Sequence, residues 1–147
     1  MSGILCAIRG GPDSRHTIDA AIRLAKEKQL PLYFLYVVNL DFLSRTSVSR
    51  VHVINEELQQ MGEFILLSAQ DRSSRHQVKA EGLIRHGKIS EEIISTCQEL
   101  KTEYVVLGRP KARTETNAFD LDRLAKFSQR ITEETGAEVI FTEEQSS

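Results

Sequence analysis

A buried strand that runs into a glycine-rich turn near the start of the chain constrains the fold most. The apolar run from Ile4 to Ile8 is too short for a free-standing helix and suits a strand buried on both faces. Arg9, Gly10 and Gly11 follow it, and a helical pattern begins almost at once. A buried strand that feeds a helix in this way is the first half of a β-α-β unit. Ligands of open α/β sheets bind beyond such carboxyl ends, so this turn is predicted to lie at a ligand site.

The rest of the sequence continues the alternation of strands and helices. Short apolar or alternating runs predict strands, and apolar residues at helical spacing predict helices. The further strands are expected at residues 32–38, 78–85, 104–107 and 138–142, and the helices begin near residues 14, 51, 90 and 121. The strand at 78–85 alternates imperfectly, as an edge strand does. We therefore predict a three-layer, doubly wound α/β fold with a five-stranded parallel sheet and four helices.

The second predicted helix carries the longest amphipathic pattern. Its stripe consists of Val51, Ile54, Leu58, Met61, Ile65 and Ser68. We interpret the stripe as facing the core, because it is too short to favour a coiled-coil seam, although the helix could instead present a partner surface. Ser90 is expected to cap the third helix, with Ile89 and Ile94 as a hydrophobic staple, and Gly136 is expected to end the fourth.

Composition and the chain start point to a cytoplasmic globular domain. The 147 residues suit one domain spanning 1–147, and a net charge of −2 gives no general attraction to nucleic acid. No apolar run is long enough to span a bilayer, so no membrane partner is expected. Met1 to Gly3 lead directly into a strand, which leaves no room for a signal peptide. Cys6 and Cys97 occupy apolar positions, as reduced core cysteines do.

No residue pattern indicates catalysis. His16, His52, His76 and His86 are scattered along polar stretches, with no nucleophile spaced for a base. The sequence holds no phosphate-binding Walker motif, no dinucleotide fingerprint and no paired Cys or His ligands for a metal. We therefore predict that the protein is not an enzyme and holds no cofactor.

The layout from Ile4 to Thr142 resembles the universal stress protein family. The resemblance rests on the first strand, on Leu35 to Val38, on Tyr104 to Gly108, and on the segment that begins His86-Gly87-Lys88 and resembles the family's approach to its third helix. It implies a sheet order of 3-2-1-4-5, with strands one and four side by side. It also implies a role in stress response or regulation. A homodimer, often made through the last strand at Val139, Ile140 and Phe141, is expected on the same ground.

The sequence departs from the family at its ATP site. Many members bind ATP through a Gly-x2-Gly-x9-Gly-(Ser/Thr) pattern after strand four, with an acidic residue at the end of strand one. Here only Gly108 matches, because Lys111, Leu121 and Asp122 occupy the other positions and Arg9 replaces the acidic residue. The glycines let backbone amides approach the phosphates, so their loss predicts that ATP is not bound in the family's way.

Two interpretations of the altered site remain. Arg9, Arg109, Lys111 and Arg113 could form a pocket for a phosphorylated or carboxylated ligand. In the favoured interpretation, Arg9 is buried, pairs with an aspartate at position 120 or 122 and fills the crevice itself. Either aspartate also suits the start of the fourth helix. The candidate ligand-binding residues are Ala7, Arg9, Gly10, Gly11, Val37, Gly108, Arg109 and Lys111.

Overall fold

Strands and helices alternate along the described part of the chain. The computed structural model describes residues 3–9, 14–39, 47–108 and 117–142, with the backbone alone described at 48 and 117–122. In chain order the elements are β1 (Ile4–Ala7), α1 (Ser14–Lys28), β2 (Leu32–Val38), α2 (Val48–Arg75), β3 (Ala80–His86), α3 (Ile89–Leu100), β4 (Tyr104–Gly108), α4 (Asn117–Thr135) and β5 (Glu138–Thr142).

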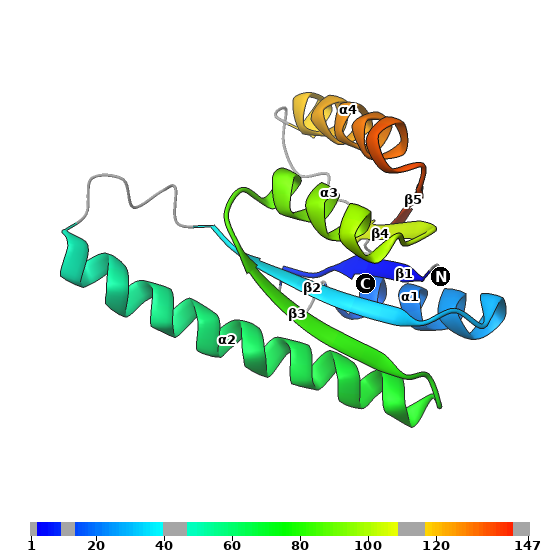
Figure 1. Ribbon diagram of the computed structural model, residues 1–147, viewed down its shortest axis with the longest axis horizontal. Coiled ribbons are helices and arrows are strands. Elements are labelled where there is room, and N and C mark those ends of the chain that lie inside the picture. The colour runs from blue at the N-terminus through cyan, green and yellow to red at the C-terminus, as the bar shows by residue number, and fades with distance from the viewer. Residues whose placement is uncertain (1–2, 10–13, 40–46, 109–116, 143–147) are drawn as a thin grey trace.

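The strands form one parallel sheet in the order β3-β2-β1-β4-β5. Helices α1 and α2 cover one face of the sheet, and α3 and α4 cover the other (Figure 1). The three-layer fold and the strand order implied by the family resemblance are therefore confirmed. The prediction that the third strand lies at an edge is also confirmed. None of the helices in the described ranges is long and apolar enough to cross a membrane.

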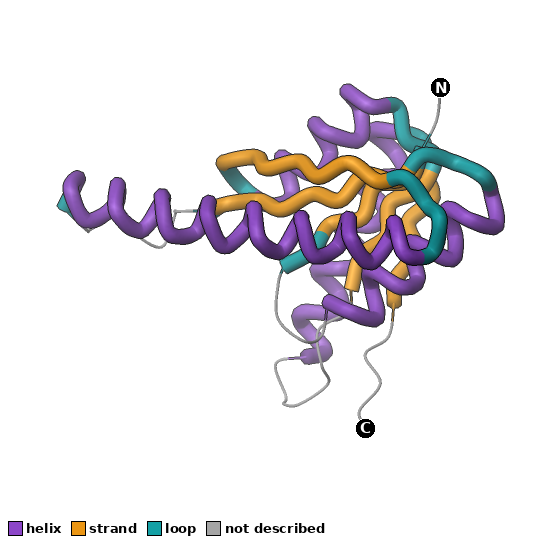
Figure 2. The backbone as a smooth tube through the Cα atoms, turned by 90° about the horizontal axis from the view of Figure 1, so that it is seen from below, coloured by secondary structure: helices purple, strands orange, loops and turns teal. Residues whose placement is uncertain are grey.

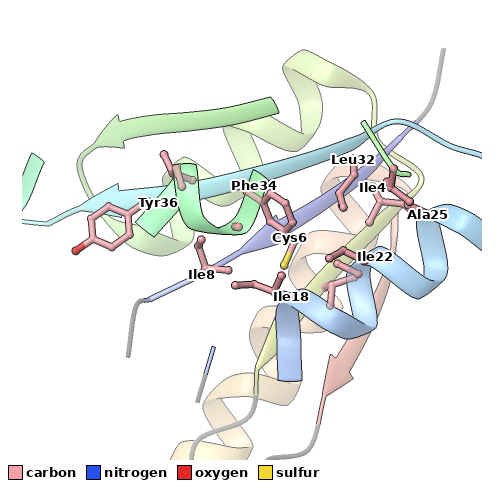
Figure 3. Packing of buried hydrophobic residues seen from close by; sticks show 14 of the residues in the cluster. Ile4, Cys6, Ile8, Ile18, Ile22, Ala25, Leu32, Phe34 and Tyr36 are labelled. Carbon is pink, nitrogen blue, oxygen red and sulfur yellow. The ribbon is translucent and has the colours of Figure 1, made fainter. Parts of the chain in front are cut away.

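The central strand β1 joins two hydrophobic cores. Ile4, Cys6 and Ile8 lie in the core under α1 and α2 (Figure 3), whereas Leu5 lies in the core under α3 and α4. Alternate side chains of a strand point to opposite faces of the sheet, so the side chains of this strand divide between the two cores. Burial raises the pKa of the Cys6 thiol, which keeps it protonated. Cys97 is likewise free and buried, as predicted.

The face that α2 turns to the sheet matches the predicted stripe only in part, because Leu58 and Ile65 pack against the core as expected. Met61 is 54% exposed and Ser68 is also exposed, so both assignments to the core are wrong. Instead Gly62, Leu66 and Ala69 are buried. A Cβ at Gly62 would lie 2.5 Å from the ring of Tyr36, so the helix approaches the sheet at its small residues. A search for large apolar side chains misses such a contact.

The start of α3 differs from the capping prediction, whereas the end of α4 agrees with it. Helix α3 begins at Ile89 with Lys88 as its N-cap, so the assignment of Ser90 as the cap is wrong. Gly87 has a φ of 147° and donates its N–H to the carbonyl of Val38 at 3.0 Å, which turns the chain before Lys88. Ile89 is thus the first residue of the helix and not the residue before its cap, so it does not occupy the position that the predicted staple requires. Gly136, with a φ of 79°, ends α4 as predicted.

The first turn of α1 packs against the carboxyl ends of β4 and β5. Thr17 is buried, and its hydroxyl lies 2.8 Å from the hydroxyl of Thr142. A Cβ at Gly108 would come within 2.7 Å of Thr17 Oγ1, closer than real Cβ atoms approach. Gly108 therefore has a packing reason to lack a side chain.

A bidentate ion pair between Asp19 and Arg72 joins α1 to α2. Arg72 Nη2 donates to Asp19 Oδ2 at 2.9 Å, and Arg72 Nε donates to Asp19 Oδ1. The hydrogen bonds from Arg72 hold the pKa of the Asp19 carboxyl below its ordinary value. The two side chains are 34% and 40% exposed, so solvent screens the pair and we assign it about 1 kcal/mol.

We expect Asp19→Asn to lower the free energy of unfolding by about 1 kcal/mol at neutral pH. Because the folded pKa of Asp19 is lowered, the stabilisation is present above the carboxyl's ordinary value of 3.8 and is lost as the pH falls through the folded value. The difference between wild type and variant should therefore shrink in acid. Urea unfolding at several pH values measures it. Asp71→Asn is the control, because Asp71 pairs with Arg75 on the exposed face of one helix and its loss should cost only about 0.3 kcal/mol.

We expect Gly108→Ala to destabilise the fold by about 1–3 kcal/mol, because the new methyl group overlaps the Thr17 hydroxyl. In a Thr17→Ala background the overlapping atom is gone, so the same substitution should cost much less. Chemical denaturation of the wild type, both single variants and the double variant gives the coupling energy. Additive effects would show that the close approach does not constrain Gly108.

Candidate functional site

The candidate site lies at the carboxyl ends of β1 and β4. β1 pairs with β2 on one side and with β4 on the other. The chain leaves β1 toward α1 on one face of the sheet and leaves β4 toward α4 on the opposite face (Figure 1). Connections that diverge in this way define the topological switch point, where ligands of doubly wound sheets bind. The switch point therefore lies between β1 and β4, at the strand ends where the sequence analysis expects a ligand site.

The sheet brings several predicted site residues to this edge. Ala7 ends β1 beside Leu35 of β2, and Val37 follows two residues later on the same strand. Gly108 ends β4 and pairs with Thr142 of β5. Ala7 and Val37 are half-buried and belong to the core under α3 and α4. The predicted residues Gly10, Gly11, Arg109, Lys111 and Arg113 lie outside the described residues.

Arg9 is the charged side chain that the structure describes at the end of β1. The Ile8 N–H still donates to the carbonyl of Leu35 at 2.9 Å, so the backbone remains attached to the sheet up to that residue. Arg9 itself is exposed. The interpretation in which a buried Arg9 fills the crevice is therefore wrong about its burial. Its proposed partners, the side chains of Asp120 and Asp122, lie outside the described side chains.

The start of α4 bears on phosphate binding. The helix begins at Asn117, which places Leu121 and Asp122 in its second turn. Within an α-helix each N–H donates to the carbonyl four residues earlier, so the amides of Leu121 and Asp122 are used inside the helix. Only the amides of the first turn remain free for an anion. The backbone at these two motif positions therefore cannot contact phosphate oxygens as it would at a helix N-terminus.

No pattern in the sequence indicates the hydroxyl pair beside this edge. Thr17 and Thr142 are far apart in the chain, and their hydroxyls meet because α1 packs across β4 and β5. Thr142 also donates to the carbonyl of Leu107 at 3.5 Å. These two neutral hydroxyl groups therefore lie between α1 and the carboxyl end of β5, beside the candidate site.

The described histidines are not gathered at the crevice. His52 is exposed and lies 3.2 Å from Glu56 within α2, and His86 contacts Gln59 at 3.0 Å. Within the described ranges, no group of three His, Cys, Asp or Glu side chains is placed to hold a metal ion. Ala7, Val37 and the exposed Arg9 are thus suited to contact a ligand through apolar groups and a guanidinium.

Comparisons with known proteins agree on one family. The sequence profile of the Universal stress protein family matches residues 1–131. The "Universal stress protein YxiE" of Bacillus subtilis (strain 168) is 30% identical over 113 residues, which cover 71% of this chain and 76% of that protein.

Solved structures share the fold at low sequence identity. The universal stress protein UspA of Lactobacillus plantarum superposes with a TM-score of 0.75 at 15% identity, covering 96% of this chain and 97% of the other. A universal stress protein in complex with cAMP gives a TM-score of 0.73 at 16% identity, covering 98% of each chain. A family member from Burkholderia pseudomallei gives 0.68 at 22% identity, covering 95% and 94%. With most of the sequence matched by the family profile and the sheet order shared, this chain belongs to the universal stress protein family.

Proposed function

We propose that the protein acts in stress response as a non-catalytic universal stress protein domain whose ATP site is degenerate. Family membership supports the stress role. The observation that carries the degenerate site is the loss of the phosphate-binding glycines after β4, where Lys111 and Leu121 occupy two of the three positions. Side chains at these positions keep backbone amides from approaching a triphosphate.

Two further features oppose ATP binding. Asp122 replaces the hydroxyl residue of the motif, and its carboxylate carries the same sign of charge as the phosphates. The helical placement of Leu121 and Asp122 already commits their amides to hydrogen bonds inside α4. The one retained glycine, Gly108, is explained by its close approach to Thr17 and needs no nucleotide to account for it.

A second candidate function is the binding of a small anion or nucleotide with fewer phosphates. Arg9 supports it, because an exposed guanidinium stands where the ATP-binding members carry an acidic residue. Among solved relatives, one is described in complex with cAMP, and another, from Archaeoglobus fulgidus, in complex with dAMP. Both ligands carry a single phosphate group, for which one arginine is a suitable partner.

We expect about 1 mM ATP to leave the melting temperature unchanged, because a ligand that does not bind the native state cannot stabilise it. Thermal unfolding with ATP, AMP, cAMP and inorganic phosphate, each with and without Mg²⁺, provides the measurement. Saturable stabilisation by ATP would contradict the degenerate site. Stabilisation by AMP, cAMP or phosphate alone would favour the second candidate. In that case Arg9→Ala should abolish the effect, whereas Arg23→Ala, which removes an exposed arginine on α1, should not.

We also propose that the protein forms a homodimer through β5. This strand ends the sheet and pairs with β4 on one side. Val139, Ile140 and Phe141 are only half-buried in the single chain. An edge strand leaves a row of N–H and C=O groups unpaired, and pairing with a second copy of the same strand would satisfy them.

Hydrogen exchange distinguishes a paired β5 from a free edge. Alternate amides of a free edge strand point to solvent and exchange rapidly, whereas pairing on both sides protects consecutive amides. We therefore expect slow exchange at Val139, Ile140 and Phe141 alike in the homodimer. β3, at the opposite edge of the sheet, is the internal control and should show the alternating pattern. The same alternation in β5, at a concentration where the protein is dimeric, would rule out this interface.

A further inference from the structure

The outer face of α2 carries an exposed apolar row. Val53, Met61, Phe64 and Leu67 are 52%, 54%, 71% and 65% exposed. Among the described residues, Ile89 is the one other large hydrophobic side chain that is similarly exposed. Scattered single exposures are ordinary, but a contiguous apolar patch on a folded domain marks an interaction surface.

This face is not needed for the core. α2 packs against β2 and β3 with its opposite side, through Gly62, Leu66 and Ala69. Figure 2 shows the helix along the near side of the molecule, extending well beyond the strands. Its 28 residues span about 42 Å, whereas the seven residues of β3 span about 23 Å. The helix thus presents a long outer surface whose apolar content the single chain does not bury.

Three of the four exposed apolar residues, Val53, Phe64 and Leu67, lie on one line of coiled-coil spacing, and Met61 flanks that line. Residues spaced alternately by four and three positions are Val53, Glu57, Gln60, Phe64, Leu67, Asp71 and Ser74, which we call the α2 seam. All seven are exposed. Alternating steps of four and three keep the side chains on one line along a helix, and two such lines pack by knobs-into-holes contacts. The spacing therefore fits a second helix better than an irregular partner.

We propose that a second copy of this chain docks on the α2 seam, with the two α2 helices antiparallel. We choose the register in which Phe64 of each copy lies opposite Leu67 of the other. The Phe64–Leu67 contact then forms twice, at the centre of the pair. Gln60 then lies opposite Asp71, and Glu57 lies opposite Ser74, beside Arg75. Like charges do not oppose one another along the seam in this register.

Charge selects the antiparallel direction. In a parallel pair in register, Glu57 would face Glu57 and Asp71 would face Asp71, and each such pair of like charges is destabilising. The antiparallel pair replaces both with polar or opposite-charge neighbours. Antiparallel helices also align their dipoles favourably. The surface is distinct from β5 and from the crevice at β1 and β4, so the inference does not rest on the proposed function.

Light scattering on the full-length protein tests the interface. We expect Phe64→Glu with Leu67→Glu to lower the particle mass at about 50 µM, to that of two copies if β5 also pairs or to that of one copy if it does not. Ile89→Glu, which removes an exposed apolar side chain elsewhere, should leave the mass unchanged. Circular dichroism checks that the variants are folded. A wild type that is already monomeric, or a mass that the double substitution does not change, would overturn the proposal.

Cysteine cross-linking tests the direction of the helices without removing the apolar centre. We expect Gln60→Cys with Asp71→Cys to give disulfide-linked dimers when diamide is the oxidant, because the two positions face each other across the antiparallel pair. Each single variant should remain unlinked. The native cysteines are buried and should not contribute. Linked dimers from either single variant would indicate parallel helices, and no linkage from the double variant would indicate that the seam is unpaired; both results contradict the proposal.

Discussion

The burial of β1 on both faces is the constraint on which the rest of the structure depends. Ile4 and Cys6 fill one core and Leu5 fills the other, so one short strand requires a helical layer on each side of the sheet. Its position between β2 and β4 sets the point at which the connections diverge to opposite faces. The location of the candidate site is therefore a consequence of how β1 is buried, whatever side chains surround it.

The proposed function separates the scaffold from the chemistry of the site that it carries. A phosphate cradle needs backbone amides that are free and unobstructed, and here side chains and helical hydrogen bonds occupy the motif positions after β4. The remaining glycine, Gly108, has no room for a side chain because Thr17 of α1 lies close to it. Under the proposed function, the fold keeps its core without binding ATP, and its role depends on surfaces and on small anions. Fold and function are separable in this way because function resides in sites that the fold carries.

Small residues decide how the layers approach one another. Gly62 lets α2 lie close to Tyr36, and Gly108 lets α1 lie close to the end of β4. α2 also contacts the core through Leu58, Ile65 and Leu66, while Met61, Phe64 and Leu67 lie on its outer face. The Asp19–Arg72 pair then fixes α1 and α2 relative to each other.

The sequence alone determined the alternation of strands and helices and the parallel sheet, because buried strands and amphipathic helices carry periodic patterns that need no tertiary information. It also predicted the last strand and the glycine after α4 to the residue. Tertiary structure alone decided that Gly62 and Ala69 of α2 face the sheet in place of Met61 and Ser68, that Lys88 and not Ser90 precedes α3, and that Arg9 is exposed. It also brought the hydroxyls of Thr17 and Thr142 together. These features depend on contacts between segments that are distant in the chain, and a local pattern of residues does not indicate such contacts.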